Sequence, residues 1–396
     1  MRFIPPTHDC RTSSSAQFAA TFIVLAACFI AWAPRAALAQ AVPLPSPNVA
    51  ARSFVLLDQT TGKVLAENNA HERVEPASIT KVMTVYVAGQ ALASGLISAS
   101  DEVVVSEKAW KMEGSRMFIE VGTRVTVDQL LDGVIVQSGN DASVALAEHV
   151  SGTEEIFATL MNEQARKLGM KNSSFANATG LPDPATFSTA FDLGLLARAL
   201  VRDFPELYQR FSHKEFTYNG IRQPNRNRLL YRDPSVDGIK TGHTSTAGYC
   251  LLTSASRDGM RLVAAVMGTD SDTARTEASQ ALLNYGYRFF ETRQLYAAGA
   301  VIAQPRVWGG ASDTVRAGVL NAVNLVIPRG RYDDMKAVAR INEPLQAPLA
   351  VGQQVGAIVL SLDDKPLDEI PLQALDTAER GSLFSRLYDD FMLLFE

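Results

Sequence analysis

The pattern of hydrophobic and polar residues changes from strand to helix and back to strand along the first three quarters of the chain. Apolar runs flank the turn sequence Thr60-Thr61-Gly62 within residues 52–68, which predicts two strands joined by a turn. Helical periodicity follows in five segments: one that starts after Ser78, then residues 126–138, 140–150, 153–168 and 190–202.

The strand pattern returns over residues 237–267, and a helix is expected from residue 273 to residue 291. Strands therefore lie at both ends of this region, with helices between them. This order predicts an α/β domain over residues 40–293, whose sheet joins the N-terminal and C-terminal parts of the region.

Beyond Arg293 the chain consists of short alternating or β-branched runs, separated by turn sequences such as Pro328-Arg329-Gly330. The runs are residues 315–319, 323–327, 336–341, 355–362 and 370–375. Their length and spacing predict a small, sandwich-like all-β domain over residues 294–380.

Residues 381–396 have an amphipathic pattern. At helical spacing the apolar stripe consists of Leu383, Phe384, Leu387, Tyr388, Phe391, Leu394 and Phe395. This stripe predicts a helix that lies in the plane of a membrane as an anchor. The alternative is a terminal helix packed on the protein or on a second copy of the chain. The polar side has one arginine and three acids, so only apolar burial would drive anchoring.

Residues 1–39 have the pattern of a cleaved secretory signal peptide. Arg2 and Arg11 precede an apolar run over residues 18–33, and a small-x-small site ends at Ala39. Cleavage after Ala41 would move the cut by two residues. A competing interpretation is a lipoprotein signal in which Cys28 becomes the lipidated N-terminus. Either signal directs the protein out of the cytoplasm, and the anchor helix would then hold it at the periplasmic face of the inner membrane.

The composition is that of an ordinary globular protein, with 396 residues of which 20% are charged and 47% hydrophobic. Without residues 1–39 the net charge changes from −5 to −7 and Cys250 is the one remaining cysteine, so an intramolecular disulfide is excluded. The chain has no basic tract, which argues against a nucleic-acid partner. Its five histidines show no His-x-x-x-His spacing, and no metal or other cofactor is expected.

The first candidate for chemistry is the pair Ser78 and Lys81. Residues three apart on a helix share a face, so the lysine can reach back to the serine hydroxyl. A lysine enclosed in such a site loses solvation, which lowers its pKa and allows it to accept a proton. The alternative is a serine that caps the helix beside a solvated lysine.

Two further motifs follow in the sequence, at residues 138–140 and 240–242. Ser138-Gly139-Asn140 alone is a common turn sequence, and Lys240-Thr241-Gly242 alone could be an ordinary exposed strand. Together with Ser78 and Lys81, and in this order, they form the set Ser-x-x-Lys, Ser-x-Asn and Lys-Thr-Gly of penicillin-recognising enzymes.

With these motifs the chain resembles the penicillin-recognising serine acyl-transferases, and most of all the low-molecular-weight penicillin-binding proteins that are D-alanyl-D-alanine carboxypeptidases. The similarity covers nearly all of the chain after residue 39 and includes residues 114–118, 188–192, 220–227 and 236–244. It implies an α/β catalytic domain of the serine β-lactamase and penicillin-binding type, with a cleft between an all-helical part and a five-stranded sheet. The small β domain and the terminal helix also match that family.

The resemblance and the chemistry together assign the catalytic roles. Ser78 is the nucleophile that attacks the carbonyl between two terminal D-alanines and forms an acyl-enzyme. Lys81 is its base, Ser138 relays the proton to the leaving amine, and Asn140 holds the substrate amide and orients Lys81. Lys240 is expected beside the Ser138 hydroxyl, whose pKa its charge would lower.

Other residues are assigned to the substrate. Thr241 and His243, at either side of Gly242, would receive the free C-terminal carboxylate together with Arg226 or Arg275. The resemblance favours Arg226 for this role; Arg275 is placed on the inhibitor or substrate side, or is structural. The backbone N–H groups of Ser78 and His243 would form the oxyanion hole. Ser115 is expected to line the cleft or to cap a turn, and the alternative for His243 is a surface residue at the end of its strand.

The expected substrates are peptidoglycan stem peptides that end in D-Ala-D-Ala, with β-lactams as covalent inhibitors. Three rival functions remain: a β-lactamase, an endopeptidase on cross-linked muropeptides, and a non-catalytic envelope protein. Class A β-lactamases use a glutamate on a loop after the Ser-x-Asn motif to deacylate, and residues 170–180 contain no acid. We therefore expect penicillins to remain attached to Ser78.

Overall fold

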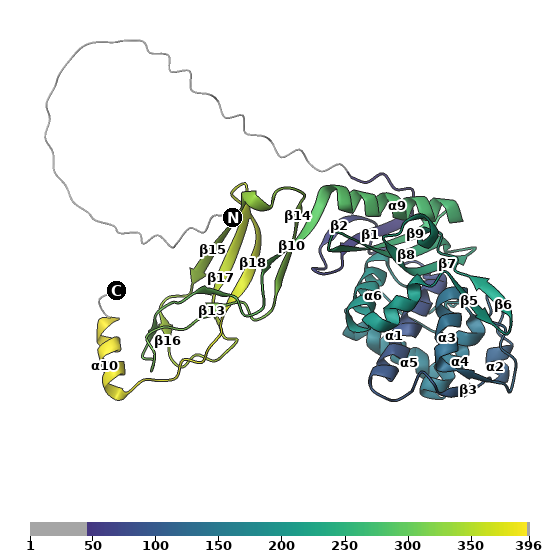
Figure 1. Cartoon of the computed structure of the whole chain (residues 1–396), viewed down its shortest axis with the longest axis horizontal. Helices are drawn as coiled ribbons and strands as arrows, with labels where there is room; N and C mark the ends of the chain where they lie inside the picture. Colours follow the sequence, from purple (N-terminus) through teal and green to yellow (C-terminus); the bar gives the residue numbers. More distant parts are fainter. Residues whose placement is uncertain (1–45, 394–396) are drawn as a thin grey trace, which may run out of the picture. The chain divides into compact units, whose positions relative to one another are not determined.

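The computed structural model describes residues 46–393 and divides them into two compact units (Figure 1). The catalytic unit comprises Ser46–Leu295 and Asn324–Gly330, and the β unit comprises the remaining described residues from Tyr296 onward. The predicted signal peptide, with Cys28 and the cleavage site at Ala39, lies outside the described residues.

The catalytic unit is built on one sheet of five antiparallel strands. Their order across the sheet is β2 (Val64–Asn68), β1 (Ser53–Asp58), β9 (Met260–Thr269), β8 (Gly248–Arg257) and β7 (Val236–Thr244). The N-terminal hairpin therefore pairs with strands from the far end of the domain. This pairing confirms the predicted α/β arrangement in which the sheet joins the two ends of the region.

Alternate residues of the central strands face two separate hydrophobic cores, because successive side chains of a strand point to opposite faces. Leu56 and Leu262 belong to the core that packs against α9 (Asp272–Phe289). Leu57 and Val263 belong to the larger core shared with the helical part of the unit. Figure 1 shows α9 on one face of the sheet and α1, α3, α5 and α6 on the opposite face.

The helical part provides one wall of the catalytic region. Its helices are α1 (Thr80–Ala93), α2 (Glu107–Trp110), α3 (Val127–Asp132), α4 (Asn140–Ser151), α5 (Glu154–Lys167), α6 (Ala190–Asp203) and α7 (Pro205–Gln209). Two short two-stranded sheets and one further helix accompany them: β3 (Glu102–Val104) with β4 (Arg124–Thr126), β5 (Glu215–Tyr218) with β6 (Ile221–Pro224), and α8 (Leu229–Arg232).

The structure differs from the sequence prediction at the helix expected over residues 126–138. Thr126 caps α3, but α3 ends at Asp132 and a single π turn, Gly133–Gln137, follows. Ser138 then takes a left-handed conformation with φ of 65° before α4 begins. Hydrophobic periodicity did not show this wider turn, because its residues Val134, Ile135 and Val136 are buried like those of an ordinary helix.

The β unit contains a five-stranded sheet of order β11 (Val301–Ala303), β13 (Ala317–Gly318), β18 (Lys365–Ala374), β17 (Gln354–Leu362) and β15 (Met335–Ile341). A second pair of strands joins β12 (Val307–Trp308) to β16 (Leu345–Gln346). The all-β prediction is confirmed. The predicted strand over residues 323–327 is present as β14 (Val323–Pro328), which lies outside the five-stranded sheet and pairs with β10 (Phe290–Tyr296).

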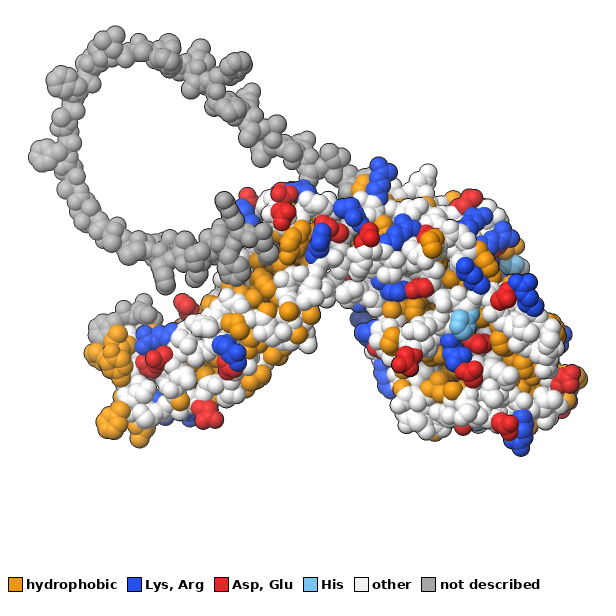
Figure 2. Space-filling view, in the orientation of Figure 1, with side chains coloured by type: hydrophobic (Ala, Val, Ile, Leu, Met, Phe, Trp, Pro, Cys, Tyr) orange, Lys and Arg blue, Asp and Glu red, His pale blue; other side chains and the backbone are white. Residues whose placement is uncertain are grey.

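The chain ends in α10 (Leu383–Met392), which Ser382 caps. The apolar stripe predicted for this helix is exposed at Leu383, Phe384, Leu387 and Tyr388, and Figure 2 shows hydrophobic side chains at the surface of α10. The polar side is attached to the β unit, since the buried Asp389 carboxylate accepts the Gly309 N–H at 2.8 Å and pairs with Arg306 at 3.2 Å. Within residues 46–393 no helix is long and apolar enough to cross a membrane.

Candidate active site

A cleft of about 840 Å³ lies in the catalytic unit between strand β7 and the helical part. It brings together most of the residues predicted from the sequence. Its lining includes Ser78, Ser115, Ser138, Asn140, Arg226, Thr241, Gly242, His243 and Arg275. Lys81 and Lys240 are buried behind this surface.

Ser78 lies in a short 3-10 turn, Ala77–Ile79, directly before α1. The N-cap of α1 is Ile79 and no side chain caps the helix, so Ser78 is not a capping residue. Ala77 has φ of 48°, a left-handed conformation that costs a non-glycine residue about 1–2 kcal/mol. The surrounding contacts therefore hold the turn that presents the Ser78 hydroxyl to the cleft.

Lys81 is fully buried and makes three hydrogen bonds through Nζ. It contacts Ser78 Oγ at 3.2 Å, donates to Asn140 Oδ1 at 2.7 Å and donates to the Thr179 carbonyl at 2.6 Å. Burial, followed by the charge of Arg226, lowers the pKa of Lys81 to about 7. The negative charge of the nearby Asp141 carboxylate acts against this and raises the pKa of Lys81. Lys81 can therefore be neutral near pH 7 and accept the Ser78 proton, and the alternative of a solvated lysine is wrong.

The Ser138-Gly139-Asn140 turn connects the cleft to Lys81. Asn140 accepts from Lys81, and its Nδ2 donates to the Glu113 carbonyl at 2.6 Å, so the side chain is held from both ends. The Ser138 hydroxyl is buried, and among the described residues it has no hydrogen-bond partner. An unpaired buried hydroxyl is costly, and at a cleft it is free to bond a substrate.

Strand β7 carries Lys240, which is buried and donates from Nζ to the Thr241 carbonyl at 3.2 Å. The expected contact between Lys240 and the Ser138 hydroxyl is not made within the described residues, because that hydroxyl has no partner there. Burial, followed by repulsion from Lys81 and Arg226, holds the pKa of Lys240 well below its usual value. An anionic substrate would relieve this crowding of positive charge.

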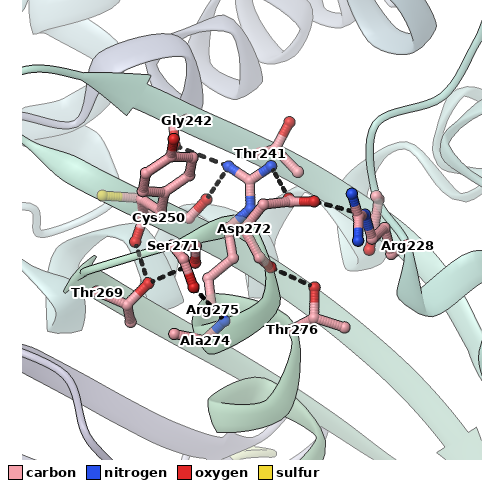
Figure 3. Close-up of polar contacts among 12 residues, drawn as sticks. Arg228, Thr241, Gly242, Cys250, Thr269, Ser271, Asp272, Ala274, Arg275 and Thr276 are labelled. Atoms are coloured by element: carbon pink, nitrogen blue, oxygen red, sulfur yellow. Dashed lines mark hydrogen bonds and ion pairs between the residues drawn. The ribbon is translucent and has the colours of Figure 1, made fainter.

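Arg226 and Arg275 differ sharply in their partners. Arg226 is exposed at the cleft surface and has no hydrogen bond or ion pair within the described part of the chain, while partial desolvation and then the charge of Arg275 lower its pKa. Arg275 pairs with Asp272 and donates to the carbonyls of Gly242 at 3.1 Å and Cys250 at 3.4 Å (Figure 3). Arg226 therefore has no bound anion or carbonyl among the described residues, whereas Arg275 is held by one carboxylate and two backbone carbonyls.

The end of β7 is fastened to the segment that precedes Ser78. A Cβ added to Gly242 would lie 2.9 Å from the Pro76 carbonyl, so only glycine allows this approach. Glu75 accepts the Thr246 hydroxyl at 2.6 Å, and the exposed ring of His243 lies on Tyr249 with centroids 4.1 Å apart. The edge strand and the nucleophile turn are thus held as one wall of the cleft.

Residues 170–180 contribute a part of the site that the sequence did not identify. Asn177 Oδ1 accepts the N–H groups of Thr179 at 3.1 Å and Gly180 at 2.7 Å, which forms the turn that directs the Thr179 carbonyl at Lys81. The spacing of Asn177 and Gly180 was a turn signal that could have been read. The Thr179 carbonyl is a backbone atom that no residue type specifies, so its hydrogen bond with Lys81 could not be predicted from the sequence.

The described residues also contain no group of three or more His, Cys, Asp or Glu side chains that could hold a metal ion. The polar side chains that line the cleft carry hydroxyls, amides, guanidinium groups and the His243 imidazole, and the one carboxylate, Asp272, is paired with Arg228 and Arg275. This set suits acyl transfer from an anionic peptide.

Comparisons with known proteins agree with this geometry. The family described as D-alanyl-D-alanine carboxypeptidase, peptidase family S11, matches residues 39–271, and the C-terminal domain of penicillin-binding protein 5 matches residues 290–380. The D-alanyl-D-alanine carboxypeptidase DacC of Escherichia coli (strain K12) is 46% identical over 358 residues, covering 88% of this chain and 90% of that protein. DacA of the same organism is 44% identical over 357 residues, with 88% and 89% covered.

Solved structures give the same result. Penicillin-binding protein 5 from Haemophilus influenzae is similar with a TM-score of 0.83 and 41% identity, over 85% of this chain and 99% of that one. Penicillin-binding protein D2 from Listeria monocytogenes, solved in an ampicillin-bound form, has a TM-score of 0.57 and 28% identity over 61% of this chain.

Proposed function

This chain belongs to the D-alanyl-D-alanine carboxypeptidase family of penicillin-binding serine peptidases, and from that premise we propose how its own residues perform the reaction. The enzyme removes the terminal D-alanine from peptidoglycan stem peptides and is acylated by penicillins. The observation that carries the residue assignment is the contact between fully buried Lys81 and the Ser78 hydroxyl.

Acylation begins when neutral Lys81 takes the proton of Ser78 and Oγ attacks the carbonyl carbon between the two D-alanines. The tetrahedral intermediate collapses by breaking the C–N bond. The unpaired Ser138 hydroxyl relays a proton to the departing amine, and D-alanine leaves with its amino group intact. Water then attacks the Ser78 ester with Lys81 as base, which frees the shortened peptide and restores the hydroxyl.

The free C-terminal carboxylate distinguishes a carboxypeptidase substrate from an internal peptide bond. We assign it to Arg226, with Thr241 and His243 on the neighbouring strand. Arg226 is supported by its lack of a carboxylate partner among the described residues and by its place in the cleft lining. Binding the carboxylate would give this arginine the partner that it lacks.

The direct test is the release of D-alanine from a soluble pentapeptide that ends in D-Ala-D-Ala. The purified enzyme should release one D-alanine per pentapeptide and nothing from the matching tetrapeptide. A fluorescent penicillin should label the same protein covalently, and Ser78→Ala should abolish both signals. No release by folded wild-type protein, or labelling that persists in Ser78→Ala, would refute the assignment.

We also propose that α10 attaches the protein to the outer face of the cytoplasmic membrane after export by residues 1–39. The exposed stripe of Leu383, Phe384 and Leu387 supports this, because burial of each large apolar side chain contributes roughly 1.5–3 kcal/mol. Asp389 does not oppose it, since its carboxylate is buried against Gly309 and Arg306.

Removing residues 381–396 should therefore move the protein from the membrane fraction to the soluble periplasmic fraction. Phe384→Ser combined with Leu387→Ser should have the same effect, while Ser385→Ala, on the same helix, should leave fractionation unchanged. Immunoblots of separated fractions measure this distribution. If the truncated protein stays with the membrane, α10 is not the anchor, and retention through a lipidated Cys28 becomes the explanation.

A further inference from the structure

A buried carboxylate next to the active site has no part in the mechanism above. Asp141, the second residue of α4, is 1% exposed and forms no ion pair with any described residue. Its two oxygens instead accept backbone N–H groups: Met117 at 2.8 Å and Ala142 at 2.8 Å on Oδ1, Phe118 at 2.8 Å and Ile119 at 3.3 Å on Oδ2. Four donors explain how the charge stays buried without a cation.

Three of these four donors belong to residues 113–119, a segment without helix or strand. Phe118 has φ of 70°, which is unfavourable for a side chain of this size, and its exposed ring lies 5.4 Å from the Arg116 guanidinium carbon. Ser115, Arg116 and Phe118 line the cleft. The bonds to Asp141 hold the backbone in this strained conformation and fix where those side chains lie.

The same segment is attached to the residue that holds the catalytic lysine. Asn140 donates from its backbone N–H to the Ser115 carbonyl at 2.7 Å and from Nδ2 to the Glu113 carbonyl at 2.6 Å, while its Oδ1 accepts from Lys81. From the other side, Gln223 of β6 donates to the Met117 carbonyl at 3.1 Å. Displacement of this segment would therefore displace the Asn140 amide.

We propose that Asp141 is a positioning residue that clamps residues 113–119 onto the Ser138-Gly139-Asn140 turn, and that it thereby fixes both the Asn140 amide against Lys81 and the cleft wall formed by Ser115, Arg116 and Phe118. The inference rests on the proposed function, since it concerns the same acylation reaction. Asp141 is buried and is not part of the cleft lining, so we assign it no contact with the substrate.

The negative charge of Asp141 predicts a change in the pH dependence of acylation. Loss of rigidity in residues 113–119 would not by itself produce that change. The charged groups that act on Lys81 are the Arg226 guanidinium, which lowers its pKa, and the Asp141 carboxylate. Lys240 is the other amine near Lys81, and the charge of Lys81 lowers the pKa of Lys240. Asp141 raises the pKa of Lys81, so removing its charge should lower that pKa below about 7. Because acylation needs neutral Lys81, the midpoint of its pH dependence should move to lower pH.

Asp141→Asn is the test, measured as the second-order rate constant of acylation by a fluorescent penicillin across pH 5–9. The asparagine places an NH₂ group against N–H donors, so the clamp is broken. We expect a loss on the order of 100-fold, the cost of misplacing a reacting group by about 1 Å, together with an acid shift of the midpoint.

Asp192→Asn is the matched control, because Asp192 is also a buried first-turn carboxylate that accepts a backbone N–H, that of Asn172 at 2.8 Å. An unshifted midpoint, or a shift equal to that of Asp192→Asn, would overturn the proposal.

Hydrogen exchange on the wild-type protein provides a second arm that does not depend on the variant folding. The amides of Met117 and Phe118 lie outside helices and strands, yet they should exchange as slowly as those of α4. Fast exchange at both would overturn the clamp. Failure of the proposed function is a separate result, since it would appear as wild-type protein that neither releases D-alanine nor reacts with penicillin.

Discussion

Lys81→Met is expected to reduce the rate of acylation by penicillin by roughly 100- to 10,000-fold, the range contributed by a positioned general base. The Ser78 hydroxyl would remain in place, but the Nζ atom 3.2 Å away that removes its proton would be gone. A time course of covalent labelling measures the loss. The wild-type rate should rise with pH up to about 7 and then level off, because burial lowers the pKa of Lys81 to about 7 and only the neutral amine accepts a proton.

Lys81→Arg separates a base from a mere positive charge. The guanidinium keeps its proton at all accessible pH values, so this variant retains the charge and loses the base. It should be as inactive as Lys81→Met. If Lys81→Arg retained more than a tenth of the wild-type rate, the lysine would act through its charge and the proposed mechanism would be wrong.

The stability of the protein should report the same titration. The folded state holds Lys81 with a pKa of about 7, against 10.5 for the exposed side chain, so between these values the unfolded chain binds more protons. The cost of burying this amine is therefore full below pH 7 and falls as the pH rises toward 10.5. Lys81→Met removes that pH dependence, and thermal unfolding measured across the window would show it.

The chemical groups of the site could be predicted because they are encoded by residue type and short spacing. Ser78 and Lys81 are one helical turn apart, and Ser138 and Asn140 share one turn of chain, so their mutual placement is local. Contacts between residues far apart in the sequence were harder to predict. Asp141 follows Asn140 directly, but its function depends on N–H groups of Met117 and Phe118, which carry no signal in the sequence.

The fold shows the same division. Helical periodicity and alternating runs identified most elements of the two units, whereas the pairing of β14 with β10 could not be predicted, because an apolar run specifies a strand but not its neighbour. The hairpin of β5 and β6 was missed, although its turn contains the hairpin signal Asn219-Gly220. Residues 220–227 were considered only for their resemblance to the family and for the role of Arg226, and no hairpin was predicted there.

Gly180→Ala is expected to destabilise the enzyme by about 2–5 kcal/mol and to impair acylation in whatever fraction folds. Gly180 has φ of 74°, which costs an alanine about 1–2 kcal/mol. The added Cβ would also lie 1.9 Å from the Ala77 carbonyl oxygen, an overlap that backbone must move to relieve, at about 1–3 kcal/mol. Either movement, of Ala77 or of residue 179, displaces a neighbour of the catalytic pair Ser78 and Lys81.

Gly169→Ala provides the matched control, since Gly169 has φ of 77° and no atom within 4 Å of its added Cβ. This variant should show only the destabilisation that comes from the positive φ. The difference in stability between the two variants therefore measures the cost of the contact with Ala77. For a domain of this size each kcal/mol lowers Tm by about 2–4 °C, which calorimetry resolves. Equal Tm values for the two variants would show that the turn before Ser78 adapts freely. The close packing of Gly180 would then not be what holds the nucleophile in place.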